Sequence, residues 1–190
     1  MNIFELITAR RTIRKFSDRP LTREQVVRYV DAARVAPSAA NMQPLKYAVI
    51  TEKDRNEQVF ATLKWAGYLK GAYDPKEGEC PAGYIVVCAD ADIRDNNCDW
   101  DVGAAVENII LCALSEGVGS CWLASVDREA LANILSLPGN LRISSVVALG
   151  YPAEAPTAVP MQEGDVKYYL EDGVLNVPKR SLDEVLINVK

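Results

Sequence analysis

A cluster of cations close to the N-terminus is the part of this sequence best suited to chemistry. Its members are Arg10, Arg11, Thr12, Ile13, Arg14 and Lys15, in a chain with a formal net charge of -5. Guanidinium groups beside a hydroxyl group suit a phosphate, and each charge-assisted hydrogen bond contributes about 1.5–3 kcal/mol. Because Arg10 and Arg14 lie four residues apart, one turn of backbone could direct both at the same anion. A solvated helix end, with its arginines paired to surface carboxylates, is the alternative interpretation.

A stiff loop of small polar side chains follows further along the chain. It runs from Pro37 to Pro44 and carries Ser38, Asn41 and Gln43. These side chains offer the donors and acceptors that suit a planar heterocycle, and the prolines restrict the backbone between them. A helix stop followed by an ordinary turn would give the same composition. Together, the loop and the basic cluster indicate a phosphorylated, ring-bearing ligand such as flavin mononucleotide (FMN).

Two further cations lie near the C-terminus. Lys179 and Arg180 precede Ser181, which forms a capping-box pattern with Glu184 and so predicts a short last helix. Cations at a helix N-terminus oppose the helix dipole, so this placement favours an external anion. The alternative interpretation is a frayed, solvated tail.

The composition limits the classes of function open to the chain. Its 190 residues predict a single domain over residues 1–190, and its acidic balance argues against nucleic acid as a partner. Histidine is absent, which removes His-based triads and dyads and imidazole metal sites, so no metal is expected. The five cysteines show no CxxC spacing and are expected to be reduced thiols, most of them buried.

No segment has the pattern of a signal peptide or a membrane span. The best candidate, Val102–Leu114, is interrupted by Glu107 and Asn108. It also falls short of the roughly 18 apolar residues that a span needs. We therefore expect a soluble protein of the cytoplasm with no membrane partner.

Hydrophobic periodicity and capping patterns predict the elements that position these residues. A short helix over 3–7 ends just before the basic cluster, and a helix capped by Thr22 must end before Pro37. Further helices are expected over 54–64, 101–116 and 127–135, and strands over 47–51, 84–89, 120–124 and 144–149. This mixture predicts an α+β fold. Residues 66–79 are expected to form a loop or lid. After residue 152 we expect a polar tail, with residues 166–190 wrapping onto a partner subunit.

An ordered set of motifs resembles the signatures of the nitroreductase family of FMN-dependent oxidoreductases. The motifs span residues 10–16, 37–44, 101–111, 117–123 and 149–152. They cover nearly the whole chain, and the ordered set is far more specific than any one motif. The resemblance implies an α+β homodimer with a central mixed or antiparallel sheet flanked by helices, and with FMN at the subunit interface.

The resemblance also assigns residues to the cofactor. The residues implied to hold the phosphate and the pyrimidine edge are Arg10, Arg11, Thr12 and Arg14. The partner subunit's loop would supply Ser38, Asn41 and Gln43. The backbone at Ala124 and Ser125 would face the flavin N5, where the Ser125 N–H could donate a hydrogen bond. Lys179 or Arg180 would contact the phosphate.

The implied reaction is a ping-pong transfer of hydride, from NADH or NADPH through flavin N5 to a nitroaromatic, a quinone or a similar electrophile. No side chain need act as an acid or base, so no catalytic residue is assigned. Leu45, Ala124 and residues 66–79 depart from the family pattern near the place where its substrates lie. Specialised flavin chemistry (dehalogenation or substrate oxidation), a non-catalytic flavin-binding protein and a plain nucleotide-phosphate binder are therefore the alternatives.

Overall fold

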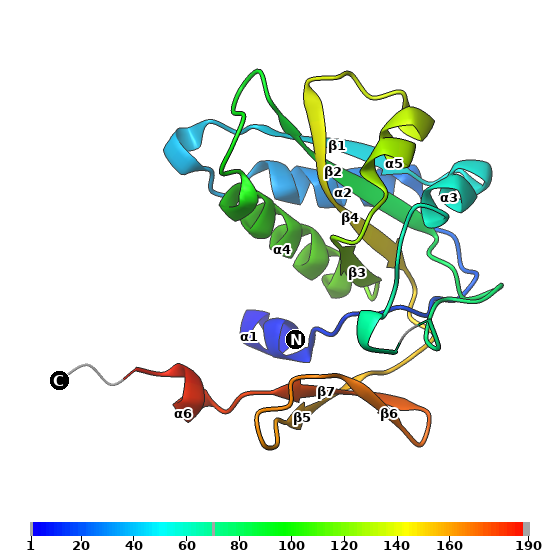
Figure 1. Cartoon of the computed structure of the whole chain (residues 1–190), viewed down its shortest axis with the longest axis vertical. Helices are drawn as coiled ribbons and strands as arrows, with labels where there is room; N and C mark the ends of the chain where they lie inside the picture. The colour runs from blue at the N-terminus through cyan, green and yellow to red at the C-terminus, as the bar shows by residue number, and fades with distance from the viewer. Residues whose placement is uncertain (1, 70, 188–190) are drawn as a thin grey trace.

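The centre of the molecule is an antiparallel sheet between two layers of helices (Figure 1). The computed structural model describes residues 2–69 and 71–187. The strands β1 (Leu45–Ile50), β2 (Gly83–Asp90), β4 (Leu141–Gly150) and β3 (Gly119–Leu123) lie in that order, and each neighbouring pair is antiparallel. The predicted α+β class is confirmed, and the central sheet is antiparallel, not mixed.

The helices begin and end close to the predicted places, except at the end of α3. They are α1 (Ile3–Ala9), α2 (Arg23–Arg34), α3 (Lys53–Phe60), α4 (Asp99–Ser115), α5 (Arg128–Leu135) and α6 (Leu182–Val185), with 3-10 turns η1 (Ala39–Asn41) and η2 (Gly67–Leu69). The predicted capping boxes at Thr22 and Ser181 are both confirmed. No helix of residues 2–69 and 71–187 is long and apolar enough to cross a membrane.

Alternate side chains of β2 build a separate core on each face of the sheet. Ile85 and Val87 pack with α2 and α4, whereas Tyr84, Val86 and Cys88 pack with α3 and α5. A strand buried on both faces reads as a continuous apolar run, which is the pattern that predicted it. Burial of both faces fixes the register, because a slip of one residue would exchange the two cores.

The helix predicted over 54–64 ends earlier, and the reason is a tertiary contact. The backbone of Leu63 pairs with Val126, and the Lys64 N–H donates to the Ser125 carbonyl at 3.1 Å. The chain therefore leaves the helix after Phe60 to pair with the segment that follows β3. Helical periodicity does not reveal such a partner, which lies far away in the sequence.

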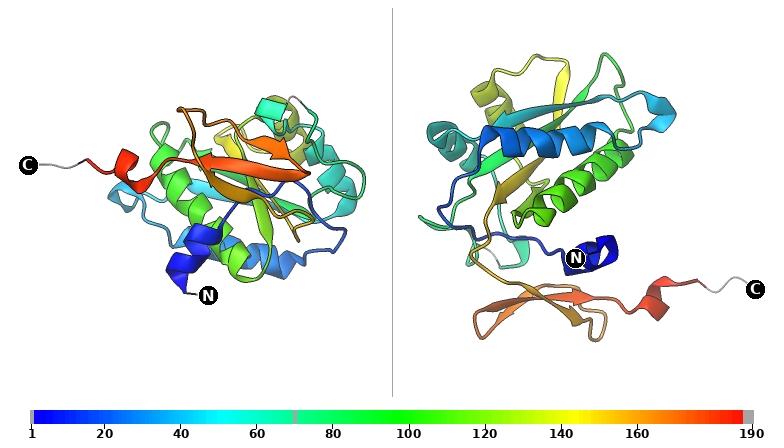
Figure 2. Two further views of the ribbon diagram at one scale, coloured as in Figure 1. Left: turned by 90° about the horizontal axis from the view of Figure 1, so that it is seen from below. Right: turned by 180° about the vertical axis from the view of Figure 1, so that it is seen from behind.

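The prediction of a polar tail after residue 152 was wrong. A second sheet follows, in the order β5 (Thr157–Pro160), β7 (Val174–Lys179) and β6 (Tyr169–Glu171). Leu175 is 1% exposed and belongs to a core cluster. The second sheet lies beneath α1, and α6 projects beyond the body of the chain (Figures 1 and 2). Residue 70 of the predicted loop and residues 188–190 of the predicted tail lie outside the described residues.

The burial of the cysteines gives an order of reactivity that can be measured. Burial raises the pKa of Cys88 to about 11, and the pKa of Cys121 to about 12. Cys80, in contrast, is exposed. Since the thiolate is the nucleophile, iodoacetamide at pH 8 is expected to modify Cys80 much faster than Cys88 or Cys121. Peptide mass spectrometry measures each rate, with urea-unfolded protein as the control. Equal labelling of Cys80 and Cys121 in the folded protein would contradict this order.

Candidate functional site

The basic cluster lies where α1 ends and runs beside β3. Arg10 is the C-cap residue of α1. Thr12 forms a parallel bridge with Ser120, and the Ile13 N–H donates to the Ser120 carbonyl at 2.8 Å. Backbone hydrogen bonds therefore anchor this segment, while the Arg10 guanidinium group lies 3.8 Å from Glu107 and Arg11 Nη1 donates to the Thr8 carbonyl at 2.9 Å.

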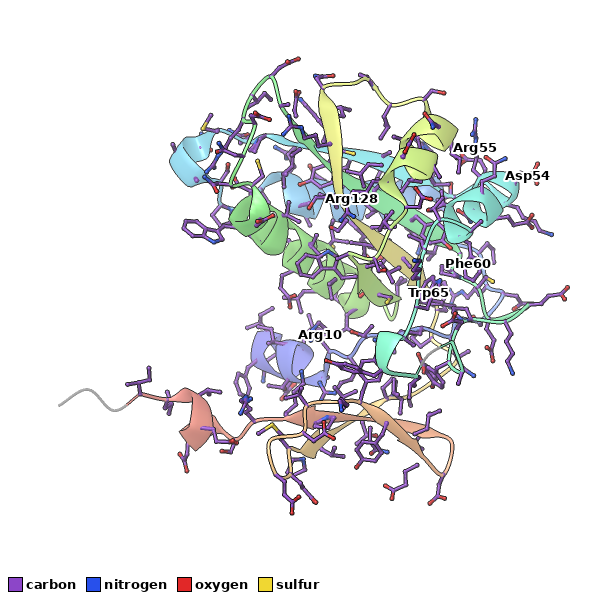
Figure 3. The ribbon with its side chains drawn as sticks, viewed as in Figure 1. Arg10, Asp54, Arg55, Phe60, Trp65 and Arg128 are labelled. Carbon is purple, nitrogen blue, oxygen red and sulfur yellow. The ribbon has the colours of Figure 1, made fainter. Side chains whose placement is uncertain are left out.

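A cavity of about 240 Å³ lies against this cluster, between α4 and the chain after β4. Arg10 and Arg11 line it, together with Ser120 and Glu154. Figure 3 shows Arg10 at the end of α1. The Nε of Arg11 is buried and has no hydrogen-bond partner among the described residues. Burial lowers the pKa of Arg11, and the charge of Arg10 lowers it further. An anion in the cavity would relieve both effects.

Glu154 joins the basic cluster to the loop at residues 66–79. One of its carboxylate oxygens accepts hydrogen bonds from the backbone N–H groups of Arg14 and Lys15, and the other accepts one from the Tyr73 hydroxyl. Burial raises the pKa of Tyr73, and its hydrogen bond to Glu154 raises it further. Sequence reasoning missed Glu154, because no motif around it signals a partner 140 residues away.

The Arg14 side chain lies over an aromatic pair. Its guanidinium carbon is 4.7 Å from the ring centroid of Tyr168, and the rings of Tyr168 and Tyr68 are 4.9 Å apart. The Tyr68 N–H also donates to the Tyr168 hydroxyl at 3.3 Å. The predicted lid thus contacts both the basic cluster and the chain leading into β6.

The polar loop after α2 is held in an unusual backbone conformation. Ala40, Asn41 and Gln43 have φ angles of 51°, 54° and 51°, although none of them is glycine. Left-handed residues of this kind persist only where their surroundings enforce them. The Gln43 side chain donates to the Asn41 carbonyl and to Asn41 Oδ1, each at 3.1 Å. Both side chains are exposed and so could meet a partner molecule.

A buried carboxylate holds the polar loop in this conformation. Asp101, which is 3% exposed, accepts hydrogen bonds from the Ser38 hydroxyl and from the Ala39 N–H. The Ser38 hydroxyl oxygen in turn accepts one from the Gln43 N–H at 2.9 Å. Arg94 lies 3.5 Å from the other Asp101 oxygen. Asp101 begins one of the family motifs, at residues 101–111, but the sequence predicted no role for it.

The two remaining predicted site segments are exposed. The Ala124 carbonyl accepts a hydrogen bond from Arg128 at 3.1 Å, and the Ser125 carbonyl accepts one from the Lys64 N–H, so both peptide planes are fixed. Lys179 and Arg180 lie at the end of β7. Arg180 is 3.7 Å from Glu184, and the half-exposed pair is worth little in energy.

Within one chain, the polar loop and the basic cluster lie toward opposite ends of α4. Asp101 contacts the loop near the start of the helix, whereas Ile110 and Leu114 line the cavity beside Arg10. At 1.5 Å per residue, these contacts are about 14–20 Å apart along the helix axis, and Glu107, which lies 3.8 Å from Arg10, is about 9 Å from Asp101. One chain therefore does not gather all the predicted residues around one small ring.

A comparison with known proteins decides the family. Residues 7–151 match the model of the nitroreductase family. The chain belongs to that family. A nitroreductase relative from Archaeoglobus fulgidus, provisionally named an NADH dehydrogenase/NAD(P)H nitroreductase, is 36% identical over 79% of this chain and 85% of its own length. The NADPH-flavin oxidoreductase of Vibrio harveyi is 26% identical over 84% of this chain and 69% of its own.

A solved nitroreductase-like structure shares the fold. It comes from Desulfovibrio desulfuricans, is provisionally described as a nitroreductase and was crystallised in complex with FMN. It superposes with a TM-score of 0.75 at 24% identity, over 100% of this chain and 98% of the other. The resemblance to nitroreductases drawn from the ordered motifs is confirmed.

Proposed function

We propose that this protein is an FMN-dependent oxidoreductase that transfers hydride from NADH or NADPH to a nitroaromatic, a quinone or a similar electrophile. The observation that carries the proposal is the cavity beside Arg10 and Arg11, where a buried guanidinium nitrogen has no partner. The FMN complex of the Desulfovibrio protein and the names of the two relatives support it.

The donors at the basic cluster fit the phosphate end of FMN. Arg10, Arg11 and Thr12 would hold the phosphate, since two cations and a hydroxyl group match its charge and its acceptor oxygens. Arg14 would contact the pyrimidine edge, where a cation stabilises the negative charge of a reduced flavin. Lys179 or Arg180 would add a third cation to the phosphate.

The ring would be held between two subunits. Ser38, Asn41 and Gln43 would come from the partner, because within one chain they lie far from the basic cluster. Exposed apolar side chains support a homodimer: Phe4 of α1 is 71% exposed and Leu182 of α6 is 68% exposed. A second copy would cover such residues. In this arrangement α6 would reach onto the partner subunit.

FMN supplies the redox chemistry when it is bound, and the chain supplies position and charge. The fixed backbone at Ala124 and Ser125 would face the flavin N5, with the Ser125 N–H as donor. Tyr68, in the lid at residues 66–79, is 54% exposed and would border the substrate. No side chain is assigned an acid or base role. A single domain over 1–190 and a cytoplasmic location stay predictions.

Spectroscopy tests this proposal. Purified protein is expected to be yellow or to bind added FMN with a change in its absorbance. Under anaerobic conditions NADH or NADPH should bleach the bound flavin, and a nitroaromatic or quinone should restore its colour. A protein that binds FMN without bleaching would be a non-catalytic flavin-binding protein. Failure to bind FMN at all would overturn the proposal, and turnover only with a halogenated substrate would favour dehalogenation.

Arg14→Ala is expected to weaken FMN binding about 10- to 100-fold, the equivalent of one lost charge-assisted hydrogen bond. Quenching of flavin fluorescence measures the affinity. The fold should survive, because backbone N–H groups, not the guanidinium group, anchor this segment. Arg19→Ala is the matched control, since Arg19 also lies over a tyrosine, 3.6 Å from the ring centroid of Tyr151. Equal FMN affinity in the two variants would show that Arg14 does not contact FMN.

A further inference from the structure

Arg128, the first residue of α5, ties that helix to two other segments of the backbone. Its Nε donates to the Ile143 carbonyl at 3.1 Å, and its Nη2 donates to the carbonyls of Ser144 and Ala124, at 3.0 and 3.1 Å. A longer contact of 3.5 Å joins Nη1 to the Val126 carbonyl. One planar guanidinium group therefore joins β4 to the chain that follows β3 (Figure 3).

A β-bulge in β4 presents two of these carbonyls. The register between β2 and β4 shifts here: one residue of β2 pairs with Ser145 and the next pairs with Ile143, which leaves Ser144 as the extra residue. Successive carbonyls of a regular strand point in opposite directions, but at the bulge both Ile143 and Ser144 accept from Arg128. Because β3 pairs with β4 only from Val146 onward, the guanidinium group takes up carbonyls that β3 does not reach.

The place of Arg128 in its helix is unfavourable without these contacts. It lies in the first turn of α5, where a cation opposes the helix dipole. No ion pair between described residues involves it, so no carboxylate offsets that cost. Its favourable contacts are the carbonyl oxygens, which accept strongly from a charged donor. A cation at this position is therefore explained by the carbonyls that it holds.

The Ala124 carbonyl and the Ser125 N–H belong to one peptide unit. Because the unit is planar and trans, its N–H points away from its carbonyl, so the hydrogen bond from Arg128 also sets the direction of the N–H. That N–H has no acceptor among residues 2–69 and 71–187, and Ser125 is exposed. The positive charge on the carbonyl also polarises the unit, which makes the N–H a stronger donor.

We propose that Arg128 is a positioning residue for the flavin, which directs the Ser125 N–H toward the flavin N5 and strengthens it as a donor. The inference rests on the proposed function, in which that N–H faces N5. Arg128 acts through the peptide unit between Ala124 and Ser125 and contacts neither FMN nor the substrate. A donor that is held in place before the flavin binds needs no rearrangement when the charge of the ring changes.

The contact between Arg128 and Ala124 can be measured without flavin. In FMN-free protein labelled with ¹³C and ¹⁵N, Arg128→Ala is expected to move the Ala124 carbonyl-carbon signal to higher field, because this carbon is deshielded by the hydrogen bond. Arg55→Ala is the matched control, since Arg55 also donates to a backbone carbonyl of α5, that of Ile134, at 2.7 Å. It should leave the Ala124 signal in place. An unchanged Ala124 signal in Arg128→Ala would overturn the proposal.

FMN labelled with ¹⁵N at N5 is the probe for the contact with the flavin. Arg128→Ala is expected to weaken FMN binding about 3- to 10-fold and to move the N5 signal to lower field, the direction in which this ring nitrogen shifts when a hydrogen bond to it is weakened. Arg55→Ala should change neither quantity. Arg128→Lys keeps the charge but not the planar fork, so it should move the N5 signal less, in the same direction.

The outcomes distinguish this proposal from the proposed function. Wild-type protein that does not bind FMN would overturn both. Bound FMN with the same N5 signal in the wild type and in Arg128→Ala would overturn the role of Arg128 alone and leave the proposed oxidoreductase intact. If Arg128→Ala does not fold, Arg128→Lys decides by the same two signals, and no displacement of either signal would overturn the proposal.

Discussion

Asp101→Ala is expected to lower the free energy of unfolding by about 3–5 kcal/mol and to abolish FMN binding. The substitution leaves Arg94, whose side chain is 18% exposed, without its carboxylate partner. It also removes the acceptor that holds Ser38 and the Ala39 N–H, so the left-handed residues of the polar loop lose their hydrogen bonds to α4. Urea denaturation at a fixed protein concentration measures the stability, and a flavin titration measures the affinity.

Asp99→Ala is the matched control, because Asp99 lies in the same first turn of α4 but is exposed. It should change stability by no more than about 0.5 kcal/mol. Asp101→Asn separates charge from geometry. Its Oδ1 can still accept from Ser38, so FMN affinity should fall less than stability does. If the Asp101→Ala variant bound FMN with the affinity of the wild type, the polar loop would not contribute to the FMN site.

Gly119→Ala is expected to cost about 1–3 kcal/mol of stability and to weaken FMN binding together with it. An added Cβ would lie 2.7 Å from Cγ1 and 3.0 Å from Cβ of Ile13. The Ile13 N–H donates a hydrogen bond to the Ser120 carbonyl of β3. A shift of the Ile13 backbone would therefore also displace the neighbouring residues of the basic cluster. Thermal unfolding and a flavin titration measure the two effects.

The control for this substitution is Gly139→Ala, where an added Cβ would meet nothing within 4 Å. It should be close to neutral for both stability and FMN affinity. A Gly119→Ala protein as stable as the wild type would show that Ile13 can repack without loss. The close approach at β3 would then not position the basic cluster.

The sequence predicted those parts of the fold that depend on neighbours along the chain. The capping boxes at Thr22 and Ser181 involve only nearby residues, and β2 is visible in the sequence as a continuous apolar run. The second sheet was missed because its strands are short and mostly exposed. A turn signal for it was nevertheless present, since Asp172-Gly173 has φ angles of 50° and 79°, as expected of a tight hairpin.

The segments of the candidate site could be predicted, but not the groups that hold them in place. Asp101 lies 63 residues from Ser38, and Glu154 lies 140 residues from Arg14. No local pattern encodes contacts over such distances, because they follow from how the sheet brings the elements together. The binding role of each residue stays a prediction until the flavin titrations are made.

The hydrogen bonds between Glu154 and the backbone of the basic cluster affect the order in which the newly synthesised protein can fold. A ribosome makes Arg14 and Lys15 early, but the carboxylate that holds their backbone is made only after all strands of the main sheet. Domains generally fold as units as the chain emerges. The nascent basic cluster therefore lacks the carboxylate that holds the backbone of Arg14 and Lys15 until residue 154 has emerged, so it reaches its final arrangement only after the main sheet has been made.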